Sequence, residues 1–174
     1  GIAYIENGRI YSATEERNGK FYSNNEIKEL KTDLKKEKIL QFLIDMNSVA
    51  QEGINLAKID NQNFDFRHYM NYGKIPLSII RVSEKKITNS ALGAKVIRGE
   101  EIKKYLPTEI VEKSIGISEK IVQSFNSEDL AIDLGLDQNM KDIYCLEVNF
   151  LPGLNKPKQP YTEEINRILS NKSK

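Results

Sequence analysis

Residues 133–153 read DLGLDQNMKDIYCLEVNFLPG, and this stretch decides the fold. Two short apolar runs, residues 130–136 and residues 143–148, flank a polar turn at residues 137–142. Apolar runs of this length, separated by turn-forming residues, are typical of a β-hairpin. The sequence therefore predicts two antiparallel strands that are joined by this turn.

The predicted hairpin carries oxygen-bearing side chains on both strands. Glu147 and Asn149 lie two residues apart on the second strand, so both project from the same face. If the strands pair through the turn, Asp133 on the first strand falls roughly opposite that face. Two carboxylates and an amide oxygen would then converge, and such ligands suit a hard cation such as Mg²⁺ or Mn²⁺. The alternative is a surface hairpin with scattered acids.

This pattern resembles the metal-binding end of the ATP-grasp ligases. In that superfamily an acidic residue on the penultimate strand is followed by an acid-x-Asn-x-x-Pro-Gly motif, and the matching positions here are Asp133, Glu147, Asn149, Pro152 and Gly153. The order of the other motifs is similar to the branch with the YheC/YheD-type endospore coat-associated proteins. The glutathione synthetase-like and ribosomal-protein-S6-modifying ligases resemble the chain more distantly. The other motifs lie at residues 49–54, 64–67, 81–82 and 88–93.

A fold and a domain organisation follow from these patterns. Strands and helices mix without βαβ regularity, which predicts an α+β protein with a mainly antiparallel sheet. The resemblance covers residues 47–154 well and residues 1–46 loosely, and it implies the large lobe of an ATP-grasp domain with packed helices. We expect residues 1–52 to be a remnant of the small lobe and the hinge, and residues 53–174 to be the large lobe with the metal site.

The resemblance also implies contacts with ATP. The strand that links the two lobes reads the adenine edge through its backbone, and its residues here are Gln51, Glu52, Gly53 and Ile54. Asp65 matches an acidic residue that approaches the ribose, although it could equally pair with the arginine two residues later.

Two arginines resemble the phosphate or acyl-phosphate ligands of the family. Arg67 and Arg81 lie on predicted neighbouring strands, and a planar guanidinium binds phosphoryl oxygens through two parallel hydrogen bonds. The alternative for each is an ordinary surface ion pair. Asn89 resembles a further polar contact at the reacting centre. His68 is the only histidine and points away from Arg67 on its strand. A general base is one reading, but a partly exposed or packed side chain is favoured.

The activity implied by the resemblance is an ATP- and Mg²⁺-dependent carboxylate–amine ligase that forms an acyl phosphate. Its substrates would be ATP, a carboxylate and an amine, the last two being unidentified amino acids or peptides. In the family a phosphate-binding lysine and a Gly-rich loop precede the equivalent of Ile2, so the chain looks like a C-terminal fragment that lacks the N-terminal lobe or lobes. We expect this fragment alone to be inactive. The alternative is a catalytically silent spore-coat-associated structural protein that retains the fold and contacts other coat proteins.

Composition narrows the class of partner. A net charge of +1 gives no electrostatic reason to expect nucleic acid or an anionic membrane surface as a partner. The single cysteine, Cys145, excludes an intramolecular disulfide, and its apolar surroundings predict a buried side chain. No apolar run approaches the length of a membrane span, and no signal-peptide pattern opens the chain. We therefore expect a cytoplasmic protein, with the endospore coat as the alternative location.

The remaining patterns predict further elements. Asn7-Gly8 is a strong turn dipeptide and predicts a hairpin at the start of the chain. Apolar residues at helical spacing mark the clearest helix, and shorter patterns mark the others. Helices are predicted at about residues 24–46, 108–125 and 162–169, and a short helix or turn at residues 99–106. Strands are predicted at residues 48–51, 64–71 and 75–82, the last two joined as a hairpin at residues 72–74.

Overall fold

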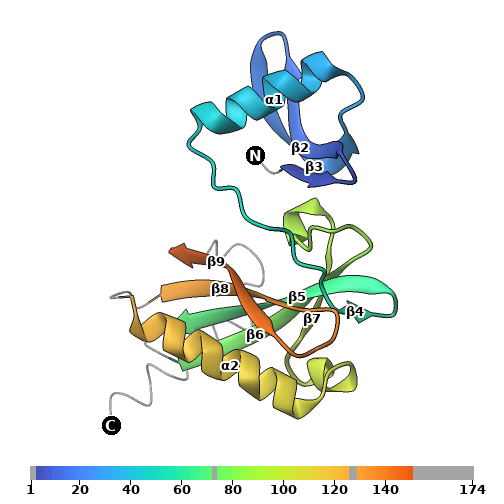
Figure 1. Ribbon diagram of the computed structural model, residues 1–174. Coiled ribbons are helices and arrows are strands. Elements are labelled where there is room, and N and C mark those ends of the chain that lie inside the picture. Colours follow the sequence, from blue (N-terminus) through green and yellow to red (C-terminus); the bar gives the residue numbers. More distant parts are fainter. Residues whose placement is uncertain (1–2, 72–73, 126–128, 151–174) are drawn as a thin grey trace. The chain divides into compact units, whose positions relative to one another are not determined.

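The structure, a computed structural model, describes residues 3–71, 74–125 and 129–150 (Figure 1). It is an α+β protein with antiparallel sheets, as the sequence predicts. The chain divides into two compact units, which are described separately below. Unit 1 comprises Gly1–Ile54 and Asn89–Gly93, and unit 2 comprises Asn55–Thr88 and Ala94–Lys174.

Unit 1 contains a three-stranded antiparallel sheet in the order β1-β2-β3 and the helix α1 (Figure 1). In its first turn Asn7 and Gly8 have φ of 49° and 73°, the left-handed conformation that a two-residue hairpin turn requires. The predicted opening hairpin is therefore confirmed. The elements are β1 (Ala3–Glu6), β2 (Arg9–Arg17), β3 (Lys20–Glu29) and α1 (Asp33–Asp45).

The helix predicted over residues 24–46 is helical only in its second part. Asn18 and Gly19 form a second left-handed turn, with φ of 52° and 75°, and return the chain along β2 as the strand β3. Helix α1 begins after Thr32, whose hydroxyl accepts a hydrogen bond from the backbone N–H of Lys35. The predicted start of the helix was wrong because the prediction did not take account of the second Asn-Gly turn, at Asn18 and Gly19.

A small apolar core joins α1 to this sheet. Ile10 and Leu30 from the strand region are buried together with Ile39 of the helix. Leu34 and Ile44 continue the apolar stripe of the helix in the sequence, but they are 64% and 67% exposed. Unit 1 thus buries only a narrow strip of its helix against its own sheet.

Unit 2 is built on a six-stranded antiparallel sheet in the order β7-β6-β5-β8-β9, with β4 also paired to β5. Helix α2 lies across one face of this sheet (Figure 1). The predicted hairpins β5–β6 and β8–β9 are both present, whereas β4 and β7 were not predicted. The strands are β4 (Lys58–Ile59), β5 (Gln62–Asn71), β6 (Lys74–Ser83), β7 (Lys95–Arg98), β8 (Asp129–Leu136) and β9 (Ile143–Phe150). The helices are α2 (Thr108–Gln123) and the 3₁₀ helices η1 (Ser90–Leu92, in unit 1) and η2 (Gly99–Lys104).

The main core lies between α2 and the sheet. Phe66 of β5 and Ile132 of β8 are fully buried there, and Val111 and Ile121 of α2 pack against the same cluster. The α2 helix confirms the periodic pattern of the sequence. Phe125, which the pattern places on the apolar face, lies beyond the helix end and is 38% exposed. This packing assigns one face of the sheet to the main core, and a second, smaller apolar cluster around Tyr69, Ile79 and Ala131 lies on the other face.

His68 links three elements inside this core. Its Nε2 lies 2.9 Å from Ser114 Oγ on α2, and its Nδ1 lies 2.8 Å from Ser78 Oγ on β6. The Ser114 hydroxyl donates to the carbonyl of Val111 at 2.7 Å, so it accepts from Nε2–H, and Ser78 donates to Nδ1. Burial lowers the pKa of His68 to about 4, so the ring is neutral at pH 7. The prediction of a packed histidine is confirmed.

Acid is expected to weaken the fold through His68. Its pKa of about 4 in the folded protein lies below the ordinary 6.5, so the stability that the neutral ring supplies is complete above about pH 6.5. It is lost as the pH falls from there to about 4, and the loss amounts to roughly 3 kcal/mol. NMR titration of this single imidazole should give the low pKa directly. A value near 6.5 would contradict the prediction, and His68→Gln should flatten the stability profile in this pH range.

Three further predictions have different outcomes. Residues 48–51 are exposed and form no strand, so that strand prediction is wrong. Cys145 is exposed and not buried, because β9 is an edge strand of the sheet. The helix at residues 162–169 lies outside the described residues, as do Pro152 and Gly153.

Candidate functional site

Charged side chains gather on the face of the unit 2 sheet that is turned away from α2. On β5, Phe66 points into the core under the helix, so its neighbours Asp65 and Arg67 point to the other side. Asp65 pairs with Arg81 on β6, and Arg67 pairs with Asp133 on β8. The sheet therefore brings together four residues that the sequence predicted separately for the site.

These four side chains form one network across β6, β5 and β8. Arg81 donates from Nε to Asp65 Oδ1 at 2.8 Å and from Nη2 to Asp65 Oδ2. The same Nη2 lies 3.0 Å from Asp133 Oδ2, and Arg67 Nη1 lies 3.4 Å from that oxygen. The side chains of Asp65, Arg81 and Asp133 are at most 5% exposed. Asp65 thus pairs with Arg81 and not with Arg67, and neither arginine is in an ordinary surface ion pair.

Burial and charge act in opposite directions on the carboxyl groups. Burial raises the pKa of Asp65 to about 6, although the hydrogen bonds and charge of Arg81 favour its ionised form. Burial also raises the pKa of Asp133, against Arg81 and Arg67, and the nearby Glu147 raises it further. Burial lowers the pKa of Arg81, but its bonds to both aspartates outweigh burial and keep the guanidinium charged. A cation at Asp133 would therefore stabilise its carboxylate.

A β-bulge in β9 decides which way Glu147 points. Leu134 pairs with Cys145, but the preceding residue, Asp133, pairs with Glu147, so Leu146 is an extra residue on β9. In an unbulged ladder Glu147 would lie on the α2 side of the sheet. The extra residue re-aims it to the face of the charged network, opposite Asp133.

The described atoms fit a cation at this place. Asp133 Oδ1 is buried without a hydrogen-bond partner. An unsatisfied carboxylate oxygen beside a second carboxylate suits a divalent cation such as Mg²⁺. Among residues 3–71, 74–125 and 129–150, no group of three or more His, Cys, Asp and Glu side chains could hold a metal. The predicted metal ligands Asp133, Glu147 and Asn149 are two carboxylates and one amide, so they do not form such a group. Their binding of a metal remains a prediction.

The formal charges of the cluster almost balance. Three carboxylates, Asp65, Asp133 and Glu147, face two guanidinium groups, Arg67 and Arg81, which leaves one negative charge when all five are ionised. A bare phosphate would meet the carboxylates as well as the arginines. A phosphate that arrives with a divalent cation satisfies both kinds of group.

The other residues predicted for the site belong to unit 1. Gln51, Glu52 and Gly53 are exposed in a segment without secondary structure, and Ile54 is half-buried. Asn89 caps η1, and its Oδ1 accepts a hydrogen bond from the backbone N–H of Ala91 at 2.8 Å. The described geometry of the charged network contains none of these residues, and their contacts with ATP remain predictions.

Sequence reasoning missed the contribution of Thr88. This residue is the last one of unit 2 before Asn89 and is 4% exposed, and its side chain acts to lower the pKa of the Asp65 carboxyl group. A threonine beside a predicted site residue was the available signal. The sequence does not indicate which residue Thr88 affects, because Thr88 and Asp65 lie far apart in the chain.

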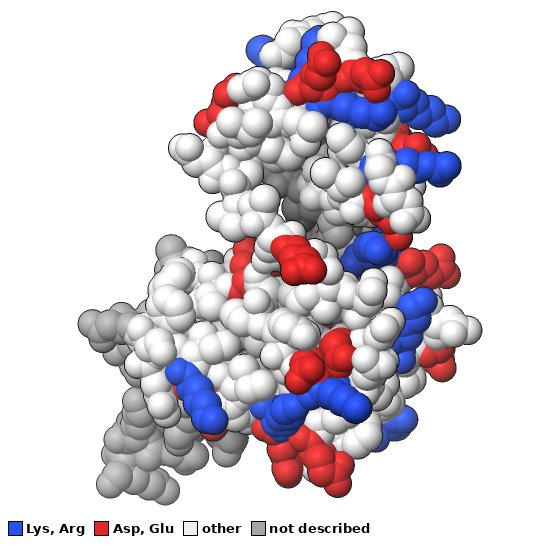
Figure 2. Space-filling view, viewed as in Figure 1, with Lys and Arg blue, Asp and Glu red and all other residues white. Residues whose placement is uncertain are grey.

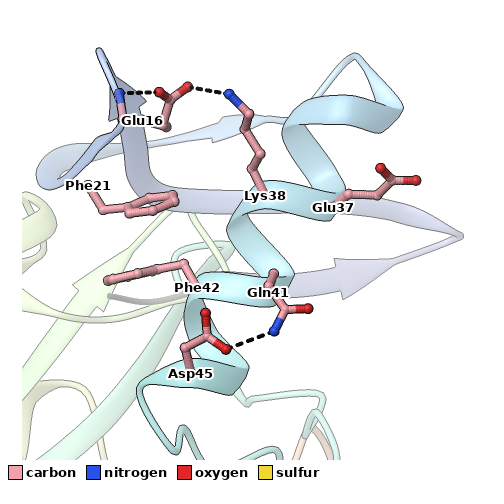
Figure 3. Close-up of a pocket in the computed structure, with 8 residues that line it drawn as sticks. Glu16, Phe21, Glu37, Lys38, Gln41, Phe42 and Asp45 are labelled. Carbon is pink, nitrogen blue, oxygen red and sulfur yellow. Dashed lines mark hydrogen bonds and ion pairs between the residues drawn. The ribbon is translucent and has the colours of Figure 1, made fainter.

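Unit 1 has a cavity of about 580 Å³ that the sequence did not indicate (Figure 3). The stacked rings of Phe21 and Phe42, with centroids 4.2 Å apart, form its apolar side. The polar groups along it mostly satisfy one another: Glu16 accepts from Lys38 and Gln41 donates to Asp45, as Figure 3 shows. The full lining is Glu16, Gly19, Phe21, Glu37, Lys38, Gln41, Phe42 and Asp45. Because most of its polar groups are paired with one another, we assign no reactive site to this cavity.

The surface carries charges of both signs. Lysine and arginine side chains are interspersed with aspartate and glutamate over the visible face (Figure 2). Exposed ion pairs such as Lys36–Asp33 and Lys103–Glu100 follow from this mixture. Among the described helices, none combines the length and apolar character that crossing a membrane requires.

Comparison with known proteins places the chain in a family. The model of the family described as YheC/D like ATP-grasp matches residues 1–173, which is nearly the whole chain. The search of curated proteins returned no match. The α+β architecture with antiparallel sheets is consistent with this family. The chain belongs to the YheC/D-like ATP-grasp family and has its ATP-binding, ligase-type fold.

Proposed function

We propose that this protein binds Mg²⁺–ATP at the charged face of unit 2 and serves as a carboxylate–amine ligase. The observation that carries the proposal is the unsatisfied Oδ1 of Asp133, held between two arginines and a facing glutamate. Buried charges are costly unless a partner satisfies them, so their retention here favours a ligand. Unit 1 with residues 1–52 would correspond to the small lobe and hinge, and unit 2 to the large lobe.

Arg67 and Arg81 would have different roles in the site. Arg81 is fully engaged with Asp65 and Asp133 and would hold the carboxylates in place. Arg67 is 18% exposed, its contact with Asp133 is long at 3.4 Å, and its buried Nε has no partner. Arg67 is therefore the better donor for a phosphoryl oxygen. Asn89 would add a polar contact at the reacting centre.

The reaction would proceed in two balanced steps. A substrate carboxylate oxygen bonds to the γ-phosphorus while the bond from that phosphorus to the β,γ-bridging oxygen breaks, and ADP leaves with the electron pair. The amine nitrogen then bonds to the acyl carbon, phosphate leaves, and the amine loses a proton to water. Arg67 would stabilise charge on the transferred phosphoryl oxygens. Mg²⁺ held by Asp133, Glu147 and Asn149 would neutralise phosphate charge when bound.

The test of the ligase is Mg²⁺-dependent ADP release by the full-length gene product in the presence of a panel of amino acids and peptides. The proposal predicts release that needs both a carboxylate and an amine, and that falls strongly in Glu147→Gln. Glu112→Gln, at an exposed position of helix α2, is the matched control and should keep the parent rate. Nucleotide binding without ADP release from any substrate would instead favour the catalytically silent, spore-coat-associated structural protein.

A further inference from the structure

Arg67 is held loosely by the other charged side chains of the network. Its Nη1 lies 3.4 Å from Asp133 Oδ2, whereas a strong bond from a guanidinium to a carboxylate is about 2.7–2.9 Å long. Within the described part of the chain, its buried Nε has no hydrogen-bond partner. The guanidinium therefore keeps N–H groups for a ligand, but this ion pair alone fixes its position poorly.

The ring of Tyr69 lies against the same guanidinium. Arg67 and Tyr69 are two apart on β5, so their side chains share the charged face of the sheet. The guanidinium carbon of Arg67 lies over the Tyr69 ring, 5.5 Å from its centroid, a distance at which the face of an aromatic ring attracts a cation. Because the contact uses the face of the ring, it steadies the guanidinium and still leaves N–H groups for oxygen acceptors.

Apolar packing fixes the ring itself. Tyr69 is 5% exposed and belongs to the second apolar cluster, together with Leu77, Ile79 and Ala131. A buried side chain in close-packed surroundings has few orientations open to it. Tyr69 is thus a rigid support beneath an arginine that is also attracted to the carboxylate of Asp133.

We propose that Tyr69 is a positioning residue that holds the Arg67 guanidinium, and that the Tyr69–Arg67 pair makes the site prefer a nucleoside triphosphate to a diphosphate. The inference rests on the proposed function, in which Arg67 donates to the transferred phosphoryl group. ATP and ADP share the base, the ribose and two phosphates, so only ATP carries the group that Arg67 would contact. Tyr69 itself touches neither nucleotide nor metal and acts through Arg67.

The first experiment compares Tyr69→Leu with Tyr69→Phe in the whole chain. Leucine keeps an apolar side chain but removes the ring, whereas phenylalanine keeps the ring. Calorimetric titrations with Mg²⁺–ATP and with Mg²⁺–ADP give the ratio of the two affinities. The parent should bind Mg²⁺–ATP at least about fivefold more tightly than Mg²⁺–ADP. Tyr69→Leu should lower this ratio by about fivefold, and Tyr69→Phe should keep it within about twofold.

Two further variants separate positioning from general loosening of the sheet. Tyr105→Leu is the matched control, because it removes a ring that packs against the main core on the other face, and it should keep the parent ratio. In Arg67→Met, which lacks the guanidinium, the addition of Tyr69→Leu should change the ratio no further. A further fall of the ratio in this double variant would show that Tyr69 acts by another route and would overturn the inference.

NMR of the parent tests the same pair without relying on the fold of any variant. The resonance of the Arg67 Nε–H reports on the guanidinium, and it should move when Mg²⁺–ATP is added and hardly move with Mg²⁺–ADP. Equal shifts with both nucleotides, no preference of the parent for ATP, or a parent-like ratio in Tyr69→Leu would overturn this inference and leave Mg²⁺–ATP binding in place. Absence of binding of either nucleotide by the parent would overturn the proposed function as well.

Discussion

Arg81→Met is expected to lower the free energy of unfolding of unit 2 by about 3–5 kcal/mol. The guanidinium is buried and bonds both Asp65 and Asp133, so its removal leaves two carboxylates with little solvent and few partners. Methionine fills a similar volume without restoring any charge. Hydrogen exchange of the β5 and β6 backbone amides measures the opening of this unit in the whole chain.

Two comparisons make this prediction specific. Arg98→Met changes an exposed arginine on the neighbouring strand β7, and its effect should be within about 0.5 kcal/mol. The double variant Asp65→Asn/Arg81→Met should cost less than the sum of its single variants, because it removes one of the two stranded charges. Strict additivity, or equal effects of the Arg81 and Arg98 variants, would show that the network does not hold the unit together.

Glu147→Gln is expected to weaken Mg²⁺–ATP binding at least tenfold, or by about 1.4 kcal/mol, while the unfolding free energy stays close to that of the parent. Glu147 is exposed on β9 and faces Asp133, so its charge serves a ligand more than the fold. Calorimetric titration of ATP in the presence of Mg²⁺ measures the affinity. Unchanged affinity in this variant would remove Glu147 from the metal set.

Asp133→Asn should behave differently from Glu147→Gln. Asp133 contacts both arginines and is 3% exposed, so its neutralisation should lower stability as well as Mg²⁺–ATP affinity. Loss of affinity in this variant alone therefore cannot separate folding from binding. The two variants together distinguish a structural carboxylate from one that serves the ligand.

The sequence predicted those elements whose local pattern is complete. The Asn7-Gly8 turn requires left-handed backbone at both residues, and asparagine and glycine adopt it most readily. Helix α2 repeats its apolar residues at helical spacing, and the hairpin β8–β9 has apolar runs on both sides of a polar turn. In each case one short stretch contains all the information that the element needs.

The partners in the charged network could not be read from the sequence. Asp65 and Arg67 are two apart on β5 and share a face, so an ion pair between them was an equal possibility. The register of β5 against β6 places Arg81 directly opposite Asp65, and burial then favours the bidentate pair. Such a choice depends on cross-strand alignment and solvent exclusion, which arise only in the folded sheet.

The bulge in β9 is a structural feature that the sequence does not reveal. The sequence predicted that Glu147 would meet Asp133, but a regular ladder drawn from the turn would put them on opposite faces. The extra residue Leu146 corrects the register. No residue type marks this position in advance, since leucine is an ordinary strand residue.

In the proposed function, Mg²⁺ and ATP bind together at the charged face of unit 2. Its most direct test is calorimetric titration of ATP into the 174-residue chain, first with Mg²⁺ and then with EDTA. We expect saturable binding with Mg²⁺ that becomes at least about tenfold weaker in EDTA, because the cation links the phosphates to Asp133 and Glu147. No saturable binding in Mg²⁺, or equal affinity in Mg²⁺ and EDTA, would contradict it.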